Sequence, residues 1–366
     1  MAELNENQIK AIKHKDGPML VFSGPGSGKT TVITRRLIYL TEKYGIDPKD
    51  ILTITFTKAA ADEMENRYLS AGGRKGVMFS TFHALFFRIL RSCFGYTVDM
   101  IMTENEKRDY LSRTIESYNI DTDDINQTVD IFLMNSGLIK NNLSNIKDYV
   151  PRDMSKDEFK ALFKLYEEHK ERNEKLDFDD MMYGCYNLLK NDSGVLEKWR
   201  KRFKYILIDE FQDINRAQYE CVKMLAWPEN NVFAVGDDDQ SIYSFRGASP
   251  SFMKEFVENY KGCRQLLLNI NYRSTDRIIA LSEKIISKNK IRFPKTIKGT
   301  GRKGEQPVLF FCKTPGDEAD RIVNKICSLH DREGIPYRDM AVIYRNNLTA
   351  NAYARRMAKR GIPYFL

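Results

Sequence analysis

The segment Ser23 to Thr30 (SGPGSGKT) constrains the fold of this chain more than any other feature. It follows a short apolar run, Pro18 to Phe22, and it precedes residues with a helical pattern. Small residues let backbone N–H groups turn inward around phosphate oxygens, and the start of a helix adds the positive end of its dipole. The sequence therefore predicts a strand, a phosphate-binding loop and a helix in direct succession.

The residue types in this loop suit a magnesium-bound nucleotide. Lys29 is expected to reach the β- and γ-phosphates, and the Thr30 hydroxyl is expected to bind Mg²⁺. The strict pattern has Gly at its first position, where this chain has Ser23. The alternative is a glycine-rich turn with an exposed lysine. The other loop residues expected to contact the nucleotide are Ser23, Gly24, Pro25, Gly26, Ser27 and Gly28.

Two carboxylates, Asp209 and Glu210, follow the apolar run Tyr205 to Ile208. A carboxylate at a strand end beside a phosphate loop is where a second Mg²⁺ contact is expected. Asp209 would hold the water shell of the metal, and Glu210 would polarise the attacking water as a general base. The alternative is a pair of solvated loop acids.

The rest of the chain predicts an α/β fold with a parallel sheet. Strands are expected at 18–22, 51–56, 77–81, 205–208, 232–235 and 265–268. Most of them end in polar, Gly- or Asp-bearing segments, which is where open parallel sheets bind ligands. Residues 94–177 carry no strand signal and predict a helical insertion. Beyond residue 275 a second α/β pattern predicts strands at 307–312, 340–345 and from 362, and helices at 317–329 and 348–359.

Composition excludes several classes of protein. No apolar run approaches the ~20 residues of a membrane span, and the polar N-terminus lacks the apolar core of a signal peptide. Six scattered cysteines without a C-x-x-C pair argue against zinc and disulfide frameworks and fit a reducing cytoplasm. The net charge of +8 permits a polyanion partner. Three basic segments, at 198–204, 288–303 and 355–360, are either solvated faces or parts of such a contact.

Taken together, these residues resemble the superfamily 1 DNA helicases of the UvrD, Rep and PcrA type. The resemblance covers the whole chain, and its segments occur in the order of that family: LNENQ (4–8), SGPGSGKT (23–30), TFTKAAADEM (55–64), STFH (80–83), LDFDDM (176–181), DEFQD (209–213), VGDDDQSIYSFRGA (235–248), NYRS (271–274) and AVIYRNN (341–347). It implies a P-loop, RecA-like first motor domain at 1–95 and 179–274 with a helical inserted subdomain at 96–178. Residues 275–366 would begin a second RecA-like motor domain, which is expected to be incomplete.

The resemblance also implies roles for residues around the nucleotide. Gln8 resembles the adenine reader, although Asn5 and Gln8 also have the spacing of a capping box, and the two roles are compatible. Tyr272 resembles the residue that stacks on the adenine, and Arg273 resembles a γ-phosphate contact. Some members have an Arg directly after the Lys-Thr pair, where this chain has Thr31 and no role is inferred.

Other segments resemble the parts of the family that sense the γ-phosphate and contact DNA. Gln240 resembles the γ-phosphate sensor, and nearby Tyr243, Phe245 and Arg246 resemble DNA-facing residues. Phe245 replaces the usual Trp; it can stack on a base, and the alternative is a core residue.

Phe56, Thr81 and His83 resemble further contacts to single-stranded DNA. A lone histidine of this kind is also typical of a satisfied core position. The segment Asp177 to Asp180 either caps a helix or positions the DNA channel.

The implied function is ATP hydrolysis, with Mg²⁺, coupled to movement on single-stranded DNA in the cytoplasm during repair or replication. The 3′-to-5′ polarity follows from the resemblance alone. The alternatives are a non-catalytic ATP- and DNA-binding module completed by a partner chain, and the motor part of a helicase–nuclease. A module would be favoured if Glu210→Gln changed neither ATP hydrolysis nor strand displacement. Because the family's further arginine falls outside these residues, this chain is expected to bind nucleotide and hydrolyse it weakly.

Overall fold

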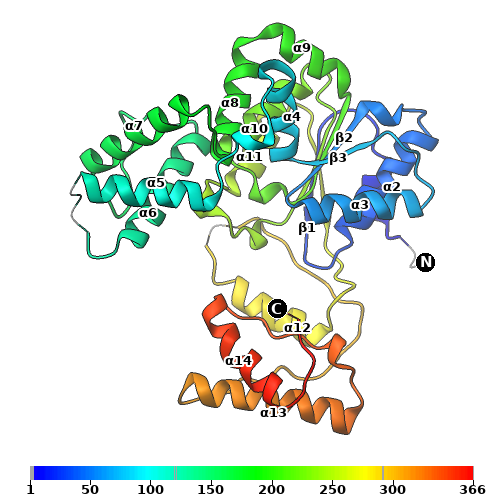
Figure 1. The fold of residues 1–366 in the computed structure, drawn as a ribbon. Coiled ribbons are helices and arrows are strands. Elements are labelled where there is room, and N and C mark those ends of the chain that lie inside the picture. Colours follow the sequence, from blue (N-terminus) through cyan, green and yellow to red (C-terminus); the bar gives the residue numbers. More distant parts are fainter. Residues whose placement is uncertain (1–3, 119, 121, 291, 366) are drawn as a thin grey trace. The chain divides into compact units, whose positions relative to one another are not determined.

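The computed structural model describes residues 4–118, 120, 122–290 and 292–365. They belong to two compact units, Met1–Gly304 and Glu305–Leu366. The larger unit contains a parallel sheet with helices on both faces, and the smaller unit contains two helices (Figure 1). Within the described residues, no helix combines the length and the apolar character needed to cross a membrane.

The sheet of the larger unit has six strands in the order β3-β2-β4-β5-β1-β6, and each neighbouring pair is parallel. Short apolar runs rich in β-branched residues suit strands that are covered on both faces. All six strands expected from the sequence are confirmed to within two residues. They are β1 (Met19–Ser23), β2 (Ile51–Thr55), β3 (Met78–Thr81), β4 (Tyr205–Ile208), β5 (Val232–Gly236) and β6 (Arg264–Leu268).

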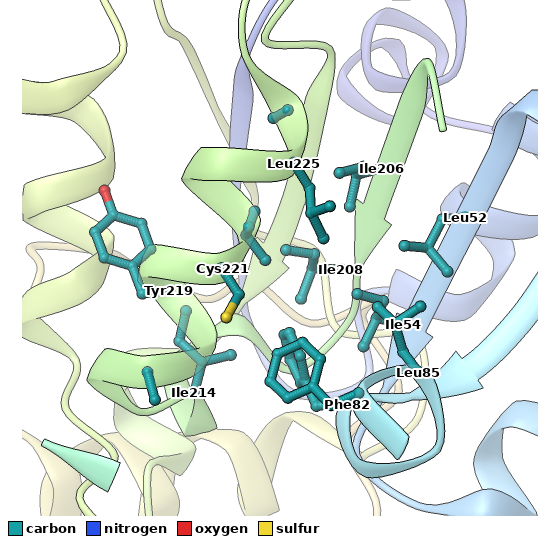
Figure 2. Close-up of a cluster of buried hydrophobic side chains, with 14 of the residues drawn as sticks. Leu52, Ile54, Phe82, Leu85, Ile206, Ile208, Ile214, Tyr219, Cys221 and Leu225 are labelled. Carbon is teal, nitrogen blue, oxygen red and sulfur yellow. The ribbon is translucent and has the colours of Figure 1, made fainter. Parts of the chain in front are cut away.

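Successive strand residues contribute to different cores because side chains alternate across a sheet. Ile51 and Leu207 belong to the core that contains α1 (Glu6–Lys13), α2 (Lys29–Glu42) and α3 (Lys58–Ser70). Leu52, Ile206 and Ile208 belong to the opposite core, together with Phe82, Tyr219 and Leu225 (Figure 2). The helices of this second core are α4 (Phe82–Phe94), α8 (Phe178–Asn191), α9 (Ser193–Arg202), α10 (Arg216–Ala226) and α11 (Ser251–Asn259).

The expected helical insertion is also confirmed. Between α4 and α8 the described chain contains α5 (Glu104–Ser117), α6 (Ile125–Asn141), α7 (Lys156–Arg172) and no named strand. These helices have a core of their own, which includes the buried rings of Phe132, Phe159 and Tyr166. After β6 the larger unit ends with α12 (Asp276–Ile286) and an irregular segment.

In the smaller unit the two predicted helices are confirmed, but the predicted strands are not. Helices α13 (Pro315–Glu333) and α14 (Asn347–Lys359) pack through Val323, Tyr353 and Met357. The strands expected at 307–312 and 340–345 are wrong, because residues 305–365 contain no strand. The strand expected from 362 is likewise absent at 362–365, and Leu366 lies outside the described residues.

The apolar side chains of these segments have no cover. Leu309, Phe311 and Ile343 are exposed by 76%, 87% and 95%. A strand requires a neighbouring backbone to accept and donate its hydrogen bonds. One or two strands without a packed apolar face are only marginally stable in water. The apolar pattern is therefore present in these segments, but the packing that would turn it into a sheet is not.

Candidate functional site

The sheet brings the predicted phosphate loop and the predicted carboxylates to one edge. Strand β5 lies between β4 and β1, and all three strands run in the same direction. Their carboxyl ends therefore deliver the segments 23–30, 209–213 and 236–240 to neighbouring positions. This arrangement is the one expected from the polar segments that follow the strands.

The backbone of the phosphate loop requires glycine at two positions. Gly28 has a φ of +86° and lies directly before α2, which begins at Lys29. Gly26 has a φ of +65°, and a Cβ there would lie 2.7 Å from the side chains of Asn271 and Arg273. Any other residue at these positions would strain the loop. The loop therefore presents its N–H groups at the start of a helix, as an anion-binding loop does.

Lys29 contacts one of the two predicted carboxylates. Its Nζ lies 2.7 Å from Glu210 Oε2, and the Lys29 side chain is only 13% exposed. Asp209 lies beside this pair, and its burial, together with the charge of Glu210, raises the pKa of its carboxyl to about 6. Asp209 and Glu210 are therefore not solvated loop acids. Two carboxylates and one ammonium group meet where the strand ends converge.

These residues fit a magnesium-bound polyphosphate. The Ser27 hydroxyl is buried in the loop and has no hydrogen-bond partner among the described residues, so it can bind a phosphate oxygen. Burial first, and then the charge of Glu210, raise the pKa of the Asp209 carboxyl, and a divalent cation beside it would favour its charged form. Asp209 and the hydroxyl of Thr30, the second residue of α2, supply the oxygen donors that Mg²⁺ prefers.

The geometry supports the capping interpretation of Asn5 and Gln8 and places Gln8 beside the phosphate loop. The capping box is confirmed: Gln8 N donates to Asn5 Oδ1, and Asn5 N donates to Gln8 Oε1. Gln8 is also buried against the phosphate loop, where its Nε2 donates to Ser27 O at 3.0 Å. In addition, Asn5 Nδ2 donates to the Tyr272 hydroxyl at 2.9 Å. The start of α1 therefore joins the loop to the predicted adenine-stacking residue, while the adenine-reading role stays a prediction.

Asn271 is a positioning residue that was not predicted from the sequence. Its buried side chain accepts hydrogen bonds from the N–H groups of Arg273 and Ser274, and Tyr272 N donates to Gly26 O at 2.9 Å. Asn often turns the chain by accepting from the backbone two residues further on, and this local signal could have identified it. Through this turn the segment 271–274 lies against the phosphate loop, although the side chains of Tyr272 and Arg273 are exposed.

A chain of side chains connects Lys29 to Gln240. Gln212 Nε2 donates to Glu210 Oε2 at 2.9 Å, and Gln212 Oε1 accepts from Asp237 N at 2.9 Å. Asp237 in turn accepts from Gln240 Nε2. Gln212 and Asp237 were not predicted as site residues, since no sequence spacing reports a contact between separate strand ends. The predicted sensor therefore shares a hydrogen-bonded network with the predicted general base.

The predicted DNA-facing residues Phe56, Tyr243, Phe245 and Arg246 come together in one patch. The ring centroids of Phe56 and Tyr243 are 4.4 Å apart, and those of Tyr243 and Phe245 are 5.9 Å apart. The guanidinium of Arg246 lies 5.6 Å from the Phe245 ring centroid. Phe245 is 49% exposed, so the alternative of a core residue is wrong. An exposed ring beside two half-buried rings and a cation suits the stacking and phosphate contacts of single-stranded nucleic acid.

Thr81 and His83 have structural roles in addition to their predicted ones. The Thr81 hydroxyl caps α4 by accepting from Ala84 N. The ring of His83 packs edge-on against Phe178 with centroids 5.4 Å apart. Burial, reinforced by the charge of Arg246, lowers the pKa of His83 to about 4. His83 is therefore neutral near pH 7 and lies close enough to the patch to sense the charge of Arg246.

We expect His83 to make the stability of the larger unit depend on pH. Its pKa is lower in the folded state, so the unfolded chain takes up the proton first as the pH falls below about 6.5. The free energy of unfolding should drop by about 2 kcal/mol between pH 7 and pH 5 from this group. Urea unfolding followed by tryptophan fluorescence, in wild type and His83→Gln, measures the difference. An identical pH dependence in both proteins would contradict the expectation.

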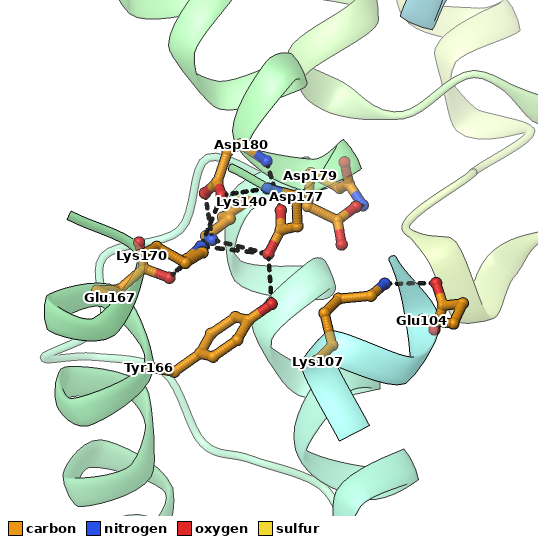
Figure 3. Close-up of polar contacts among 10 residues, drawn as sticks. Glu104, Lys107, Lys140, Tyr166, Glu167, Lys170, Asp177, Asp179 and Asp180 are labelled. Atoms are coloured by element: carbon orange, nitrogen blue, oxygen red, sulfur yellow. Dashed lines mark hydrogen bonds and ion pairs between the residues drawn. The ribbon is translucent and has the colours of Figure 1, made fainter. Parts of the chain in front are cut away.

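The capping interpretation of Asp177 to Asp180 is confirmed, and it is part of a larger ionic cluster. Asp177 caps α8 by accepting from Asp180 N, and Asp180 accepts from Asp177 N. Lys140 of α6 and Lys170 of α7 point into the same cluster (Figure 3). Burial acts to raise the pKa of Asp177, but the two lysines outweigh it and lower that pKa. The cluster joins the inserted helices to α8.

Comparison with known proteins gives a consistent result. A family model described as the UvrD/REP helicase N-terminal domain matches residues 4–261, and one described as the UvrD-like helicase C-terminal domain matches residues 266–366. The Bacillus subtilis protein YjcD is 39% identical, over 99% of this chain and 48% of its own length. ATP-dependent DNA helicases PcrA of Staphylococcus epidermidis and Staphylococcus aureus are each 34% identical, over 99% of this chain and 50% of theirs. The chain thus spans about half the length of these relatives.

Proposed function

Because the chain belongs to the UvrD/REP helicase family, we propose that it binds ATP with Mg²⁺ and acts in an ATP-dependent motor on single-stranded DNA. The observation that carries the proposal is the contact between Lys29 and Glu210 beside the half-buried Asp209, whose carboxyl has a raised pKa. A phosphate loop alone would suit many nucleotide-binding proteins. The strand-end glutamate that pairs with the loop lysine adds a carboxylate that can act as the general base in hydrolysis.

The residues at the strand ends divide the chemistry among them. Thr30 and Asp209 would hold Mg²⁺, which neutralises charge on the phosphate oxygens when it is bound. Lys29 would move from Glu210 to the β- and γ-phosphates, and this exchange would free Glu210 to accept a proton from the attacking water. Arg273 would add positive charge near the γ-phosphate. Gln8 and Tyr272 would contact the adenine.

The network around Gln240 provides a route from the nucleotide to DNA. Gln240 lies three residues before Tyr243, and Tyr243 belongs to the aromatic patch with Phe56 and the exposed Phe245. An amide that binds the γ-phosphate loses a partner on hydrolysis, so its segment can shift. Because that segment also holds the aromatic rings, the shift would move the surface on which bases stack.

The finer features of the proposal depend on family resemblance. They are movement in the 3′-to-5′ direction, a role in repair or replication, and a cytoplasmic location. The boundaries of the two motor domains and of the inserted subdomain, at residues 95, 178 and 274, are proposals of the same kind.

Equilibrium binding tests the proposal directly. The chain should bind a fluorescent, non-hydrolysable ATP analogue more tightly with Mg²⁺ than with EDTA. It should also bind a fluorescein-labelled single-stranded oligonucleotide with an affinity that falls steeply as salt increases. A chain that binds neither ligand would overturn the proposal.

Phe245→Ala should weaken binding of single-stranded DNA. Stacking of a base on an exposed ring contributes about 1–3 kcal/mol, so we expect a loss of roughly 5- to 150-fold in affinity. Phe245→Trp should retain or increase affinity because the larger ring keeps a stacking face. Phe94→Ala removes an exposed ring at the end of α4 and serves as the matched control. Fluorescence anisotropy measures the affinities. Equal losses of affinity in the Phe94 and Phe245 variants would mean that the patch does not bind DNA.

A further inference from the structure

The basic segment after α12 is not simply a solvated face. Lys295 lies within this segment, yet its side chain is only 1% exposed. Its Nζ contacts Asp237 and lies 2.5 Å from Asp238 Oδ1 and 3.0 Å from Asp239 Oδ2. A lysine is seldom buried to this extent unless it is paired, so the contact with three consecutive carboxylates accounts for its position.

A second cation completes the arrangement. Arg292 donates to both oxygens of Asp239, at 2.9 and 2.7 Å, and Phe293 N donates to Asp238 Oδ2 at 2.8 Å. Each of the three carboxylates therefore receives a partner from residues 292–295. We call these contacts between 292–295 and 237–239 the acidic-loop clamp.

The carboxylates of the clamp lie close enough together to repel one another. One oxygen atom from each carboxylate lies within 4.8 Å of the other two, the spacing of a cation site. In this protein the ammonium group of Lys295 takes the position of that cation. Burial acts to lower the pKa of Lys295, but Asp237 and Asp238 raise it above its usual value, so the group is charged. Without this charge, the loop 237–239 would be expected to open.

Asp237 links the clamp to the predicted γ-phosphate sensor. Its Oδ1 contacts Lys295, its Oδ2 accepts from Gln240 Nε2, and its backbone N donates to Gln212. A cavity of about 340 Å³ is lined by residues of the clamp together with Gln240 and with Pro25 of the phosphate loop. The clamp, the sensor and the loop therefore border the same space.

We propose that Lys295, assisted by Arg292, is a positioning residue that orients the amide of Gln240 toward the terminal phosphate of a nucleoside triphosphate. The inference rests on the proposed function, because it assumes that a nucleotide occupies the phosphate loop. In this proposal Lys295 acts through Asp237, which contacts both Lys295 and the amide of Gln240. The loss of its charge should therefore affect recognition of the third phosphate and leave the diphosphate contacts of the loop intact.

The experiment compares two nucleotides in the full 366-residue chain. Dissociation constants for a non-hydrolysable ATP analogue and for ADP, both with Mg²⁺, are measured for wild type and Lys295→Met. We expect the preference for the triphosphate to fall by about 10-fold, the effect of losing one hydrogen bond to a charged group. ADP affinity should change less than about 2-fold. Lys295→Arg should restore most of the preference, because it returns the positive charge.

Two further variants keep the result interpretable. Lys290→Met removes an exposed lysine of the same segment for which the described residues show no ion pair, and it should leave both affinities unchanged. Arg292→Met removes the ion pair with Asp239 and leaves Lys295 in place. The Arg292 side chain is 18% exposed, so this variant should fold and lower the preference about 3-fold. If Lys295→Met does not fold, the Arg292 variant decides.

Each outcome has a distinct meaning. Equal loss of both nucleotides in Lys295→Met would indicate a purely structural role and overturn the inference. An unchanged preference in a folded Lys295→Met, or in Arg292→Met when the Lys295 variant does not fold, would also overturn it. If the wild-type chain binds neither nucleotide, the proposed function fails instead.

Discussion

Replacing Lys29 with Met is expected to weaken binding of a MgATP analogue by roughly 100-fold. The ammonium group is 2.7 Å from Glu210, at the first residue of α2 and at the edge where the strand ends converge. A charged hydrogen bond contributes about 1.5–3 kcal/mol, and Lys29 would contact two phosphates. The methionine side chain has nearly the same length and removes only the charge. Titration with a fluorescent analogue measures the change.

Glu210→Gln provides the contrast to this variant. It removes the carboxylate that holds Lys29 but leaves the lysine free to meet phosphate, so binding should be retained or become tighter. Hydrolysis in a single-turnover assay should decrease, because the group expected to activate water is gone. Lys10→Met removes an exposed lysine of α1 and is the control for loss of one positive charge. If Lys29→Met binds as wild type does, Lys29 does not hold the phosphates.

Replacing Lys140 with Met is expected to lower the free energy of unfolding of the larger unit by about 3–5 kcal/mol. Lys140 is 4% exposed, and its Nζ lies 2.8 Å from Glu167 and 2.5 Å from Asp180 (Figure 3). The variant leaves these carboxylates and Asp177 with a single lysine, Lys170. Burial raises the pKa values of Asp179 and Asp180 already in the intact cluster. Without Lys140, the remaining buried carboxylates repel one another with less compensation, and this destabilises the folded state.

Both tryptophans of the chain, Trp199 and Trp227, lie in the larger unit, so urea unfolding followed by their fluorescence reports on that unit. Lys164→Met is the matched control on α7. Its side chain is 77% exposed and 3.9 Å from Glu168, so its loss should change stability by no more than about 0.5 kcal/mol. A similar loss in both variants would mean that the buried cluster contributes no more than a surface ion pair.

Much of the larger unit could be predicted because its signals are local. The apolar runs at β1, β2, β4 and β5 are buried on both faces, and such runs differ sharply from the polar segments that follow them. Parallel strands place those polar segments at one edge, so Lys29 and Glu210 could be expected to meet. The capping boxes at Asn5 and Asp177 were also predictable, because both partners lie within one helical turn.

The parts that failed or were missed depend on contacts between distant segments. The apolar runs at 307–312 and 340–345 have strand patterns, but no neighbouring backbone pairs with them among residues 305–365. Gln212 and Asp237 belong to different strand ends, and nothing in their spacing reports that they share a hydrogen bond. Lys295 and Asp238 are separated by 57 residues, and a basic segment gives no sign of which lysine is buried.

The sequence by itself determined which segments become strands of the larger unit and which residue types stand at their carboxyl ends, because periodicity and turn residues act over a few neighbours. Tertiary structure alone decided how those ends are connected. It extended the expected Lys29–Glu210 pair to Gln212, Asp237 and Gln240 in one network, and it turned Lys295 from a surface charge into a buried partner of three carboxylates. The physical reason is that burial makes an unpaired charge costly, and only the completed fold determines which charges are buried together.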